Sequence, residues 1–214
     1  MSIVRSHMST ALDGYTSGPN QSLDAPFGEG TEHFNDWLFR LATTRALFGE
    51  TGGETGASND VFAERMANVG AYIMGRNMFG GGPGPWKTEP AWNGWWGDDP
   101  PYHVPVYVVT SHPRVPLEMQ GGTTFHFTSG IESALGQARA AAGKKDVVIA
   151  GGARTVQQYL RIGAIDELEL HLVPMLLGCG ERLFNNVPAS SLRLEQMRSV
   201  PGNGVTHVRY RVIR

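Results

Sequence analysis

The segment Val147 to Leu160, VVIAGGARTVQQYL, most strongly constrains how this chain folds. Its first three residues form a β-branched apolar run, which is typical of a buried parallel strand. Gly151-Gly152 ends that run, and apolar residues from Val156 onward then recur at helical spacing. A strand, a glycine turn and a helix therefore follow one another directly. This order predicts an α/β fold with a central, mostly parallel sheet flanked by helices.

The glycine turn at Gly151-Gly152 has the local geometry of a phosphate site. A helix that begins here leaves the backbone N–H groups of Ala153, Arg154 and Thr155 without intrahelical partners, and its dipole favours an anion. Glycine also lets a pyrophosphate lie against the backbone. The turn is neither a G-x-G-x-x-G nor a Walker A loop, because Arg154-Thr155 stands where Gly-Lys-Thr is required. An ordinary tight strand-to-helix turn is the alternative interpretation.

Length and composition restrict the class of protein. With 214 residues and 41% hydrophobic content, we expect one domain over residues 1–214. The chain has no apolar run near the roughly 18 residues of a membrane span, and no secretory pattern at its start. A net charge of −2 with both signs scattered argues against a nucleic-acid or membrane partner. The single cysteine, Cys179, excludes an intramolecular disulfide and favours the cytoplasm.

Periodicity and turn residues predict that strands and helices alternate along the chain, followed by a C-terminal antiparallel hairpin around Pro201-Gly202-Asn203-Gly204. Gly-rich loops separate the first elements. The expected strands cover residues 3–12, 71–74, 104–110, 124–127, 147–149, 167–177, 192–200 and 205–212, and the expected helices cover 32–44, 61–68, 131–142 and the segment after 152.

Two further strand ends carry groups that suit phosphate. Gly75-Arg76-Asn77 follows one predicted strand, and Thr110-Ser111-His112-Pro113-Arg114 follows the next. Guanidinium, imidazole and hydroxyl groups all donate hydrogen bonds to anions. Ligands of open α/β sheets bind at the carboxyl ends of strands, so three such ends favour a ligand with well-separated phosphates, such as NADPH. The alternatives are a surface ion pair for Arg76 and a turn cap for Ser111-His112.

Residues 80–101 form a long segment rich in Gly, Pro and Trp. A loop of this length is usually functional or disordered, and its four tryptophans argue against disorder. We expect Trp95 and Trp96 to stack on a planar substrate or to line a dimer interface, with core packing as the alternative.

The chain resembles the dihydrofolate-reductase-like superfamily, and within it the group related to the reductase domain of the bifunctional riboflavin-biosynthesis deaminase–reductase. The resemblance covers nearly the whole chain, with segments in the same order and spacing. The zinc-binding deaminase half is not part of it, so no metal site is expected. The matching segments are ALDGYTSGPN at 11–20, GGETG at 52–56, GAYIMGRNMFGG at 70–81, PVYVVTSHPR at 105–114, GGTTFHF at 121–127, VIAGGARTVQQYLR at 148–161 and DELELHLVPMLLGCGERLF at 166–184.

The resemblance implies that NADPH lies across the strand ends. Its pyrophosphate is then expected on Gly151 to Thr155 and beside Gly75 to Asn77, and its 2′-phosphate near Thr110 to His112 and Arg114. The nicotinamide is expected to meet Ala11, Leu12 and Gly14. Asp13 would orient the substrate or relay a proton after hydride transfer. The alternative is that Asp13 is a turn residue that holds its own backbone.

The implied activity is NADPH-dependent hydride transfer to a small heterocyclic molecule, and the nearest named reaction is reduction of 5-amino-6-(5-phosphoribosylamino)uracil in riboflavin biosynthesis. Arg154 and Arg182 are candidates to bind a sugar phosphate. A dihydrofolate or pterin reductase is an alternative, although Glu32 and Asp36 on the predicted first helix lack the usual aromatic context. A non-catalytic NADP-binding module is another. We expect a cytoplasmic homodimer that binds a small-molecule substrate.

Overall fold

The computed structural model describes residues 2–87 and 91–213, so residues 88–90 of the expected tryptophan-rich loop lie outside the described residues. In the described part, nine strands form one sheet in the order β10-β11-β8-β1-β7-β3-β4-β6-β5. The strands from β8 to β6 are parallel, and the pairs made by β10, β11 and β5 are antiparallel. The strands are β1 (Val4–Ala11), β3 (Val69–Gly75), β4 (Pro105–Val109), β5 (Leu117–Glu118), β6 (Thr124–Thr128), β7 (Asp146–Gly151), β8 (Glu167–Val173), β10 (Arg193–Gly202) and β11 (Val205–Ile213), with β2 (Tyr15–Ser17) and β9 (Glu181–Arg182) paired separately.

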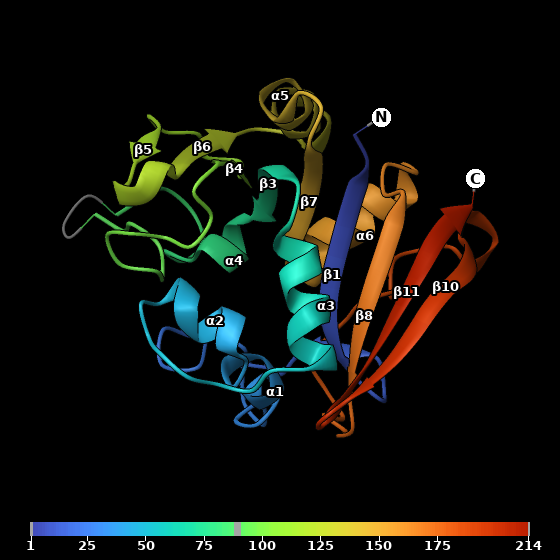
Figure 1. The fold of residues 1–214 in the computed structure, drawn as a ribbon. Coiled ribbons are helices and arrows are strands. Elements are labelled where there is room, and N and C mark those ends of the chain that lie inside the picture. Colours follow the sequence, from blue (N-terminus) through green and yellow to red (C-terminus); the bar gives the residue numbers. More distant parts are fainter. Residues whose placement is uncertain (1, 88–90, 214) are drawn as a thin grey trace.

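Helices cover both faces of this sheet (Figure 1). On one face, α5 and α6 pack against β3, β4 and β7, and alanines at positions 134, 138 and 142 let α5 approach the strands closely. The opposite face carries α1, α2 and α3, together with the loop that contains the tryptophans. The α-helices are α1 (Asp36–Phe39), α2 (Ala42–Leu47), α3 (Ala57–Met66), α4 (Arg76–Phe79), α5 (Ile131–Ala142) and α6 (Ala153–Arg161).

The predicted α/β architecture is confirmed, but the predicted helix at 32–44 is wrong in extent. Two short helices, α1 and α2, occupy this region instead. Leu41 has extended backbone dihedrals and forms a β-bridge with Glu54. The Ala42 N–H donates to the Glu54 carbonyl at 2.9 Å, and the Glu54 N–H donates to the Arg40 carbonyl at 2.7 Å. This long-range pairing satisfies the backbone groups that a continuous helix would otherwise use.

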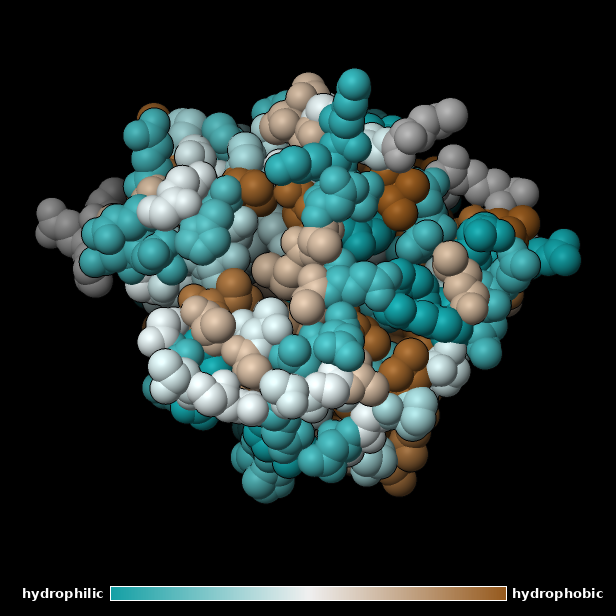
Figure 2. Space-filling model, in the orientation of Figure 1, coloured by the Kyte–Doolittle hydropathy of each residue, from teal (hydrophilic) through white to brown (hydrophobic). Residues whose placement is uncertain are grey.

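The space-filling view shows a mainly hydrophilic face on which the apolar patches are small and separated (Figure 2). In the part of the chain that the structure describes, no helix combines the length and the apolar character that crossing a bilayer requires.

Candidate functional site

The carboxyl ends of five neighbouring parallel strands, β1, β7, β3, β4 and β6, lie along one edge of the sheet. The register aligns them closely, because Gly75 at the end of β3 pairs with Val109 on β4, and Val109 pairs with Thr128 on β6. On the other side, Met74 pairs with Gly151. The three strand ends that the sequence singled out are therefore direct neighbours, with the ends of β1 and β6 beside them.

Close packing joins the two glycine turns at this edge. A side-chain carbon at Gly75 would collide with the Thr155 hydroxyl in the first turn of α6. Gly151 has φ +136°, and its peptide bond to Gly152 is cis. Gly152 itself has φ −72°, so the left-handed conformation belongs to Gly151 and not to Gly152. Glycine therefore serves two purposes here: Gly75 permits close approach, and Gly151 permits the turn.

Two helix N-termini at this edge have no side-chain cap. Gly152 is the N-cap of α6 and Gly130 is the N-cap of α5, and neither position makes a side-chain capping bond. Tyr159 ties the two helices together, because its hydroxyl donates to the Ile131 carbonyl at 2.8 Å. Uncapped N–H groups and the helix dipoles favour bound anions. The arrangement provides two such positions on adjacent helices.

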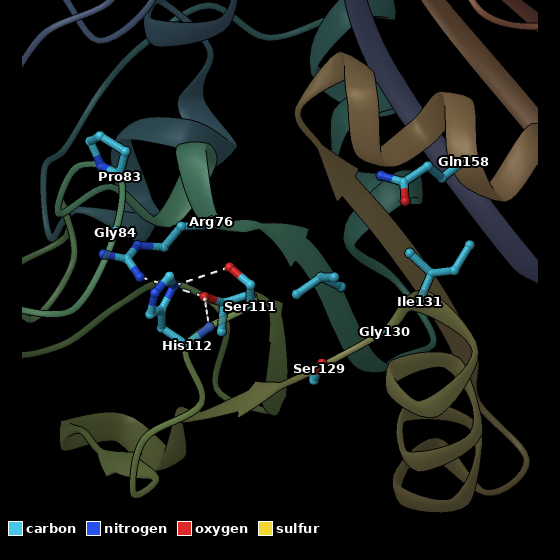
Figure 3. Close-up of a pocket in the computed structure, with 11 residues that line it drawn as sticks. Arg76, Pro83, Gly84, Ser111, His112, Ser129, Gly130, Ile131 and Gln158 are labelled. Carbon is cyan, nitrogen blue, oxygen red and sulfur yellow. Dashed lines mark hydrogen bonds between the residues drawn. The ribbon is translucent and has the colours of Figure 1, made fainter.

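An open pocket of about 440 Å³ lies between these helices and the ends of β3, β4 and β6 (Figure 3). It brings together the predicted residues Arg76, Thr110, Ser111 and His112. The opposite wall is formed by Ser129, Gly130, Ile131 and Gln158, which were not predicted from the sequence. Ser129-Gly130 repeats the strand–glycine–helix pattern of the segment at 147–160, so this part of the wall was detectable from sequence. The remaining lining residues are Pro83, Gly84 and Val109.

Hydrogen bonds shape the β4 side of the pocket. The Thr110 hydroxyl accepts from the His112 backbone N–H at 3.1 Å, and Ser111 Oγ lies 3.0 Å from His112 Nδ1. The Arg76 guanidinium donates to Thr110 Oγ1 at 3.5 Å and to the carbonyls of Gly80 and Gly81. Thr110 therefore caps the turn at residues 110–112, and the polar groups of this turn also line the pocket. The described contacts of Arg76 are with carbonyl, hydroxyl and indole groups, which does not support the surface ion pair.

Asp13 acts on a distant loop rather than on its own turn. Its Oδ2 accepts from the backbone N–H groups of Leu177 at 3.0 Å and Gly178 at 2.7 Å. The backbone of Gly14 instead closes the local turn by donating to the Ala11 carbonyl at 2.9 Å. The interpretation of Asp13 as a residue that holds its own backbone is therefore wrong. Its Oδ1 is buried and has no hydrogen-bond partner among the described residues.

The predicted substrate residues lie in three different surroundings. Arg182 is exposed, with its guanidinium carbon 4.6 Å from the centroid of the Tyr15 ring. Arg154 is held by Glu181 through a bidentate ion pair, with contacts of 2.7 and 3.1 Å. Trp95 and Trp96 lie in aromatic packing, where Trp96 stacks on Phe125 and Trp95 meets Trp92 edge-to-face. These contacts favour the core-packing alternative for both tryptophans. Of the remaining predicted residues, Leu12 and Asn77 are exposed, and Ala11 and Ala153 are buried.

Residues 2–207 match the RibD C-terminal domain family. The chain belongs to this family. No curated protein sequence gives a significant match.

Solved structures confirm the dihydrofolate-reductase-like fold. A Shewanella sp. PV-4 protein assigned to riboflavin biosynthesis shares 22% identity over 99% of both chains, with a TM-score of 0.64. Enterococcus faecalis dihydrofolate reductase, complexed with NADP(H) and RAB-propyl, shares 15% identity over 98% of this chain and 96% of its own, with a TM-score of 0.54. The bifunctional deaminase and reductase of Thermotoga maritima shares 11% identity with a TM-score of 0.56, and this RibD-family chain spans 57% of its length.

Neither carboxylate expected on the first helix of this RibD-family chain, Glu32 or Asp36, is buried. Glu32 precedes α1 rather than lying in it. The Asp36 side chain is 54% exposed and accepts from His33 Nδ1 at 2.9 Å. Both residues are exposed, whereas the folate alternative expects a carboxyl group on the first helix that protonates the pterin. This observation weighs against the folate alternative.

A second polar cluster, His7, Glu169 and His171, lies buried on the face of the sheet under α3, with possible ligand atoms within 4.8 Å of one another. Its carboxylate is already neutralised, because Glu169 accepts from Arg198 at 3.3 Å and from Arg209 at 3.2 Å. His7 Nδ1 also donates to this carboxylate at 3.1 Å. With two guanidiniums in contact, the cluster is electrostatically unfavourable for a divalent cation. We interpret it as structural.

Proposed function

We propose that the protein is an NADPH-dependent oxidoreductase that transfers hydride to a small heterocyclic substrate. The observation that carries this proposal is the row of five parallel strand ends, with uncapped helix N-termini and the Arg76 pocket along it. A dinucleotide has the extended shape that this row accommodates, and ligands of α/β sheets bind at such edges. RibD-family membership and the fold shared with an NADP(H)-bound reductase support the same conclusion.

The residues present fit this cofactor. Gly152 leaves the backbone open, because a side-chain carbon at this position would stand in free space where a pyrophosphate can approach. Arg76, Ser111 and His112 supply donors and positive charge for a 2′-phosphate, each charge-assisted bond contributing about 1.5–3 kcal/mol. When bound, NADPH supplies the hydride. The protein's part is to bind, orient and shield the reactants.

We propose that hydride transfer takes place at the carboxyl end of β1, at one end of the row of strand ends. Asp13 fastens the loop at Leu177-Gly178 to this strand end, and Leu12 and Leu176 beside it expose 63% and 73% of their surfaces. Exposed apolar side chains next to a fixed carboxylate suit a planar heterocycle with polar edges. We propose that Asp13 positions this substrate through the loop that it holds, and that its negative charge assists the proton transfer that accompanies hydride transfer.

A phosphoribosyl-pyrimidine is the substrate that we propose, and 5-amino-6-(5-phosphoribosylamino)uracil is the nearest named compound. The exposed Arg182 is the available cation for its phosphate, because Arg154 is already engaged by Glu181. The fold shared with the Riboflavin Biosynthesis Reductase of Saccharomyces cerevisiae supports this choice. The expected homodimer stays a prediction.

The direct test is NADPH oxidation by the purified protein with phosphoribosylaminopyrimidine and dihydropteridine substrates in parallel. We expect oxidation with the pyrimidine and none with the pteridine. Activity only with the pteridine would support the folate alternative. NADPH binding without turnover on either class would support the non-catalytic module, and absence of NADPH binding would overturn the proposal.

A further inference from the structure

Trp86 contacts both arginines on the Thr110 side of the pocket. The guanidinium carbon of Arg76 lies 3.1 Å from the centroid of the Trp86 ring, and that of Arg114 lies 4.1 Å from it. The face of an indole carries negative charge density and attracts cations. Trp86 therefore stabilises two like charges in one small region.

Holding two guanidinium groups close together in a partly buried region costs free energy. Burial, and the nearby charge of Arg114, lower the pKa of Arg76 from its usual range. Arg114 is also partly desolvated, since it lies against the Phe127 ring at 4.2 Å and donates to the Trp92 carbonyl at 2.8 Å. Two guanidiniums with unfavourable solvation and mutual repulsion separate unless something holds them. The indole supplies that attraction.

The orientation of the Trp86 ring is itself fixed. Its Nε1–H donates to the His112 carbonyl at 2.6 Å. Phe79 and Phe127 meet the ring edge-to-face, with centroids at 5.8 and 5.1 Å. His112 lines the pocket, so one hydrogen bond connects the indole to the pocket wall, and the contact with Arg76 connects it to the next strand end.

We propose that Trp86 is a positioning residue that sets the preference for a 2′-phosphorylated dinucleotide. Its ring holds the Arg76 guanidinium at the pocket wall and also contacts the Arg114 guanidinium. Its Nε1–H fixes the turn at His112. The inference rests on the proposed function. It extends that function by assigning cofactor discrimination to an aromatic side chain that lies outside the pocket lining.

The test compares two probes, adenosine 2′,5′-bisphosphate and adenosine 5′-monophosphate, by calorimetric titration of the full chain. The readout is the dissociation constant of adenosine 5′-monophosphate divided by that of adenosine 2′,5′-bisphosphate. A general loss of structure weakens the binding of both probes alike and leaves this ratio unchanged. We expect Trp86→Leu to lower this ratio by about 10-fold or more, as expected when a charge-assisted contact is lost. Trp86→Phe, which keeps an aromatic face, should retain the ratio to within about 3-fold.

Two further variants keep the test decisive. Trp37→Leu removes a buried indole from a different core cluster, so it should reduce thermal stability and leave the ratio unchanged. If Trp86→Leu does not fold, Trp86→Met keeps apolar bulk without a π face and should lower the ratio in the same way. A ratio that stays at the wild-type value in a folded Trp86→Leu or Trp86→Met variant overturns the inference. An unchanged ratio in Arg76→Ala also overturns it, because Arg76 then does not bind the 2′-phosphate. Failure of the wild type to bind NADPH overturns the proposed function itself.

Discussion

His171 and His207 join through their Nδ1 atoms, 2.8 Å apart, in the interior of the protein. The bond has one direction, because Arg65 lies 3.4 Å from His171 Nε2 and a guanidinium only donates. His171 Nδ1–H must then donate to His207, whose Nε2–H donates to Ser58 Oγ at 3.0 Å. Each neutral ring donates once and accepts once, and the chain ties α3 to β8 and β11. An added proton would set two donors against each other.

The first prediction is that stability falls on acidification. Burial lowers the pKa of His171 well below its usual range and also lowers that of His207, and burial lowers the pKa of His7 to about 4. Unfolding returns these groups to about 6.5. Below that pH the unfolded state binds more protons than the folded state, so the free energy of unfolding decreases from about pH 6.5 down to about pH 4. Urea unfolding at a series of pH values measures this slope.

The charged groups facing these histidines are Arg5, Arg65, Glu169, Arg198 and Arg209. Although burial raises the pKa of Glu169, the contacts with His7 and Arg209 hold it far below its usual value, so this carboxylate stays charged over the same pH range. His207→Asn removes one titrating group, so it should flatten the slope even though it lowers stability at neutral pH. An unchanged slope in this variant would show that His207 does not contribute.

The second prediction concerns Arg76, which lines the pocket and contacts Thr110. Arg76→Ala should weaken NADPH binding by roughly 10- to 150-fold, the loss of one charge-assisted bond, and leave NADH binding nearly unchanged. Arg161→Ala, at the exposed C-terminal end of α6, is the matched loss of one positive charge and should alter neither. Equal weakening of both cofactors would contradict a role in binding the 2′-phosphate.

The third prediction is a rescue between Gly75, at the end of β3, and Thr155, in the first turn of α6. Gly75→Ala should destabilise the fold, because the new methyl group collides with the Thr155 hydroxyl. Thr155→Ala removes that hydroxyl, while the Thr155 Cβ lies at an ordinary 3.5 Å from the new carbon. The double variant should therefore recover most of the lost stability, which a double-mutant cycle of thermal unfolding measures. Additive losses would show that the two positions are not in contact.

The fourth prediction separates folding from binding at the neighbouring turn. Gly152 has negative φ and open space around the position of a side-chain carbon, so Gly152→Val should fold with a normal circular dichroism spectrum. The branched side chain then occupies the proposed approach of the pyrophosphate, and NADPH binding should be lost. Normal NADPH affinity in the folded variant would remove the pyrophosphate from this turn.

The fifth prediction concerns Asp13. In Asp13→Asn the amide oxygen can still accept from Leu177 and Gly178, but the amide group replaces the buried, unpartnered Oδ1. We expect a loss of about 1–3 kcal/mol in stability, nearly unchanged NADPH affinity, and turnover lower by about 100-fold because the negative charge is gone. Single-turnover hydride transfer and thermal unfolding on the same variant measure both effects. Unchanged turnover would leave Asp13 with a purely structural role.

The sequence by itself determined the parts of this protein that depend on local pattern. The strand, glycine turn and helix at 147–160 needed only a β-branched run, two glycines and helical spacing, and the structure has β7 and α6 there. The same patterns placed β3, β4 and α5 within a few residues of their observed bounds. Local backbone preferences and side-chain periodicity are encoded over a few neighbouring residues, so they can be read without the fold.

Tertiary structure decided which residues of these strands, helices and loops contact one another. Insertion of β7 between β1 and β3 sets Gly151 beside Gly75, and the return of the chain after β8 lets Asp13 hold residues that follow it by more than 160 positions. The break at Leu41 depends on its bridge to Glu54, and the contact of Trp86 with Arg76 and Arg114 depends on the path of a loop. Such contacts arise from strand order and long-range packing, and short-range sequence patterns do not specify which individual residues that order brings together.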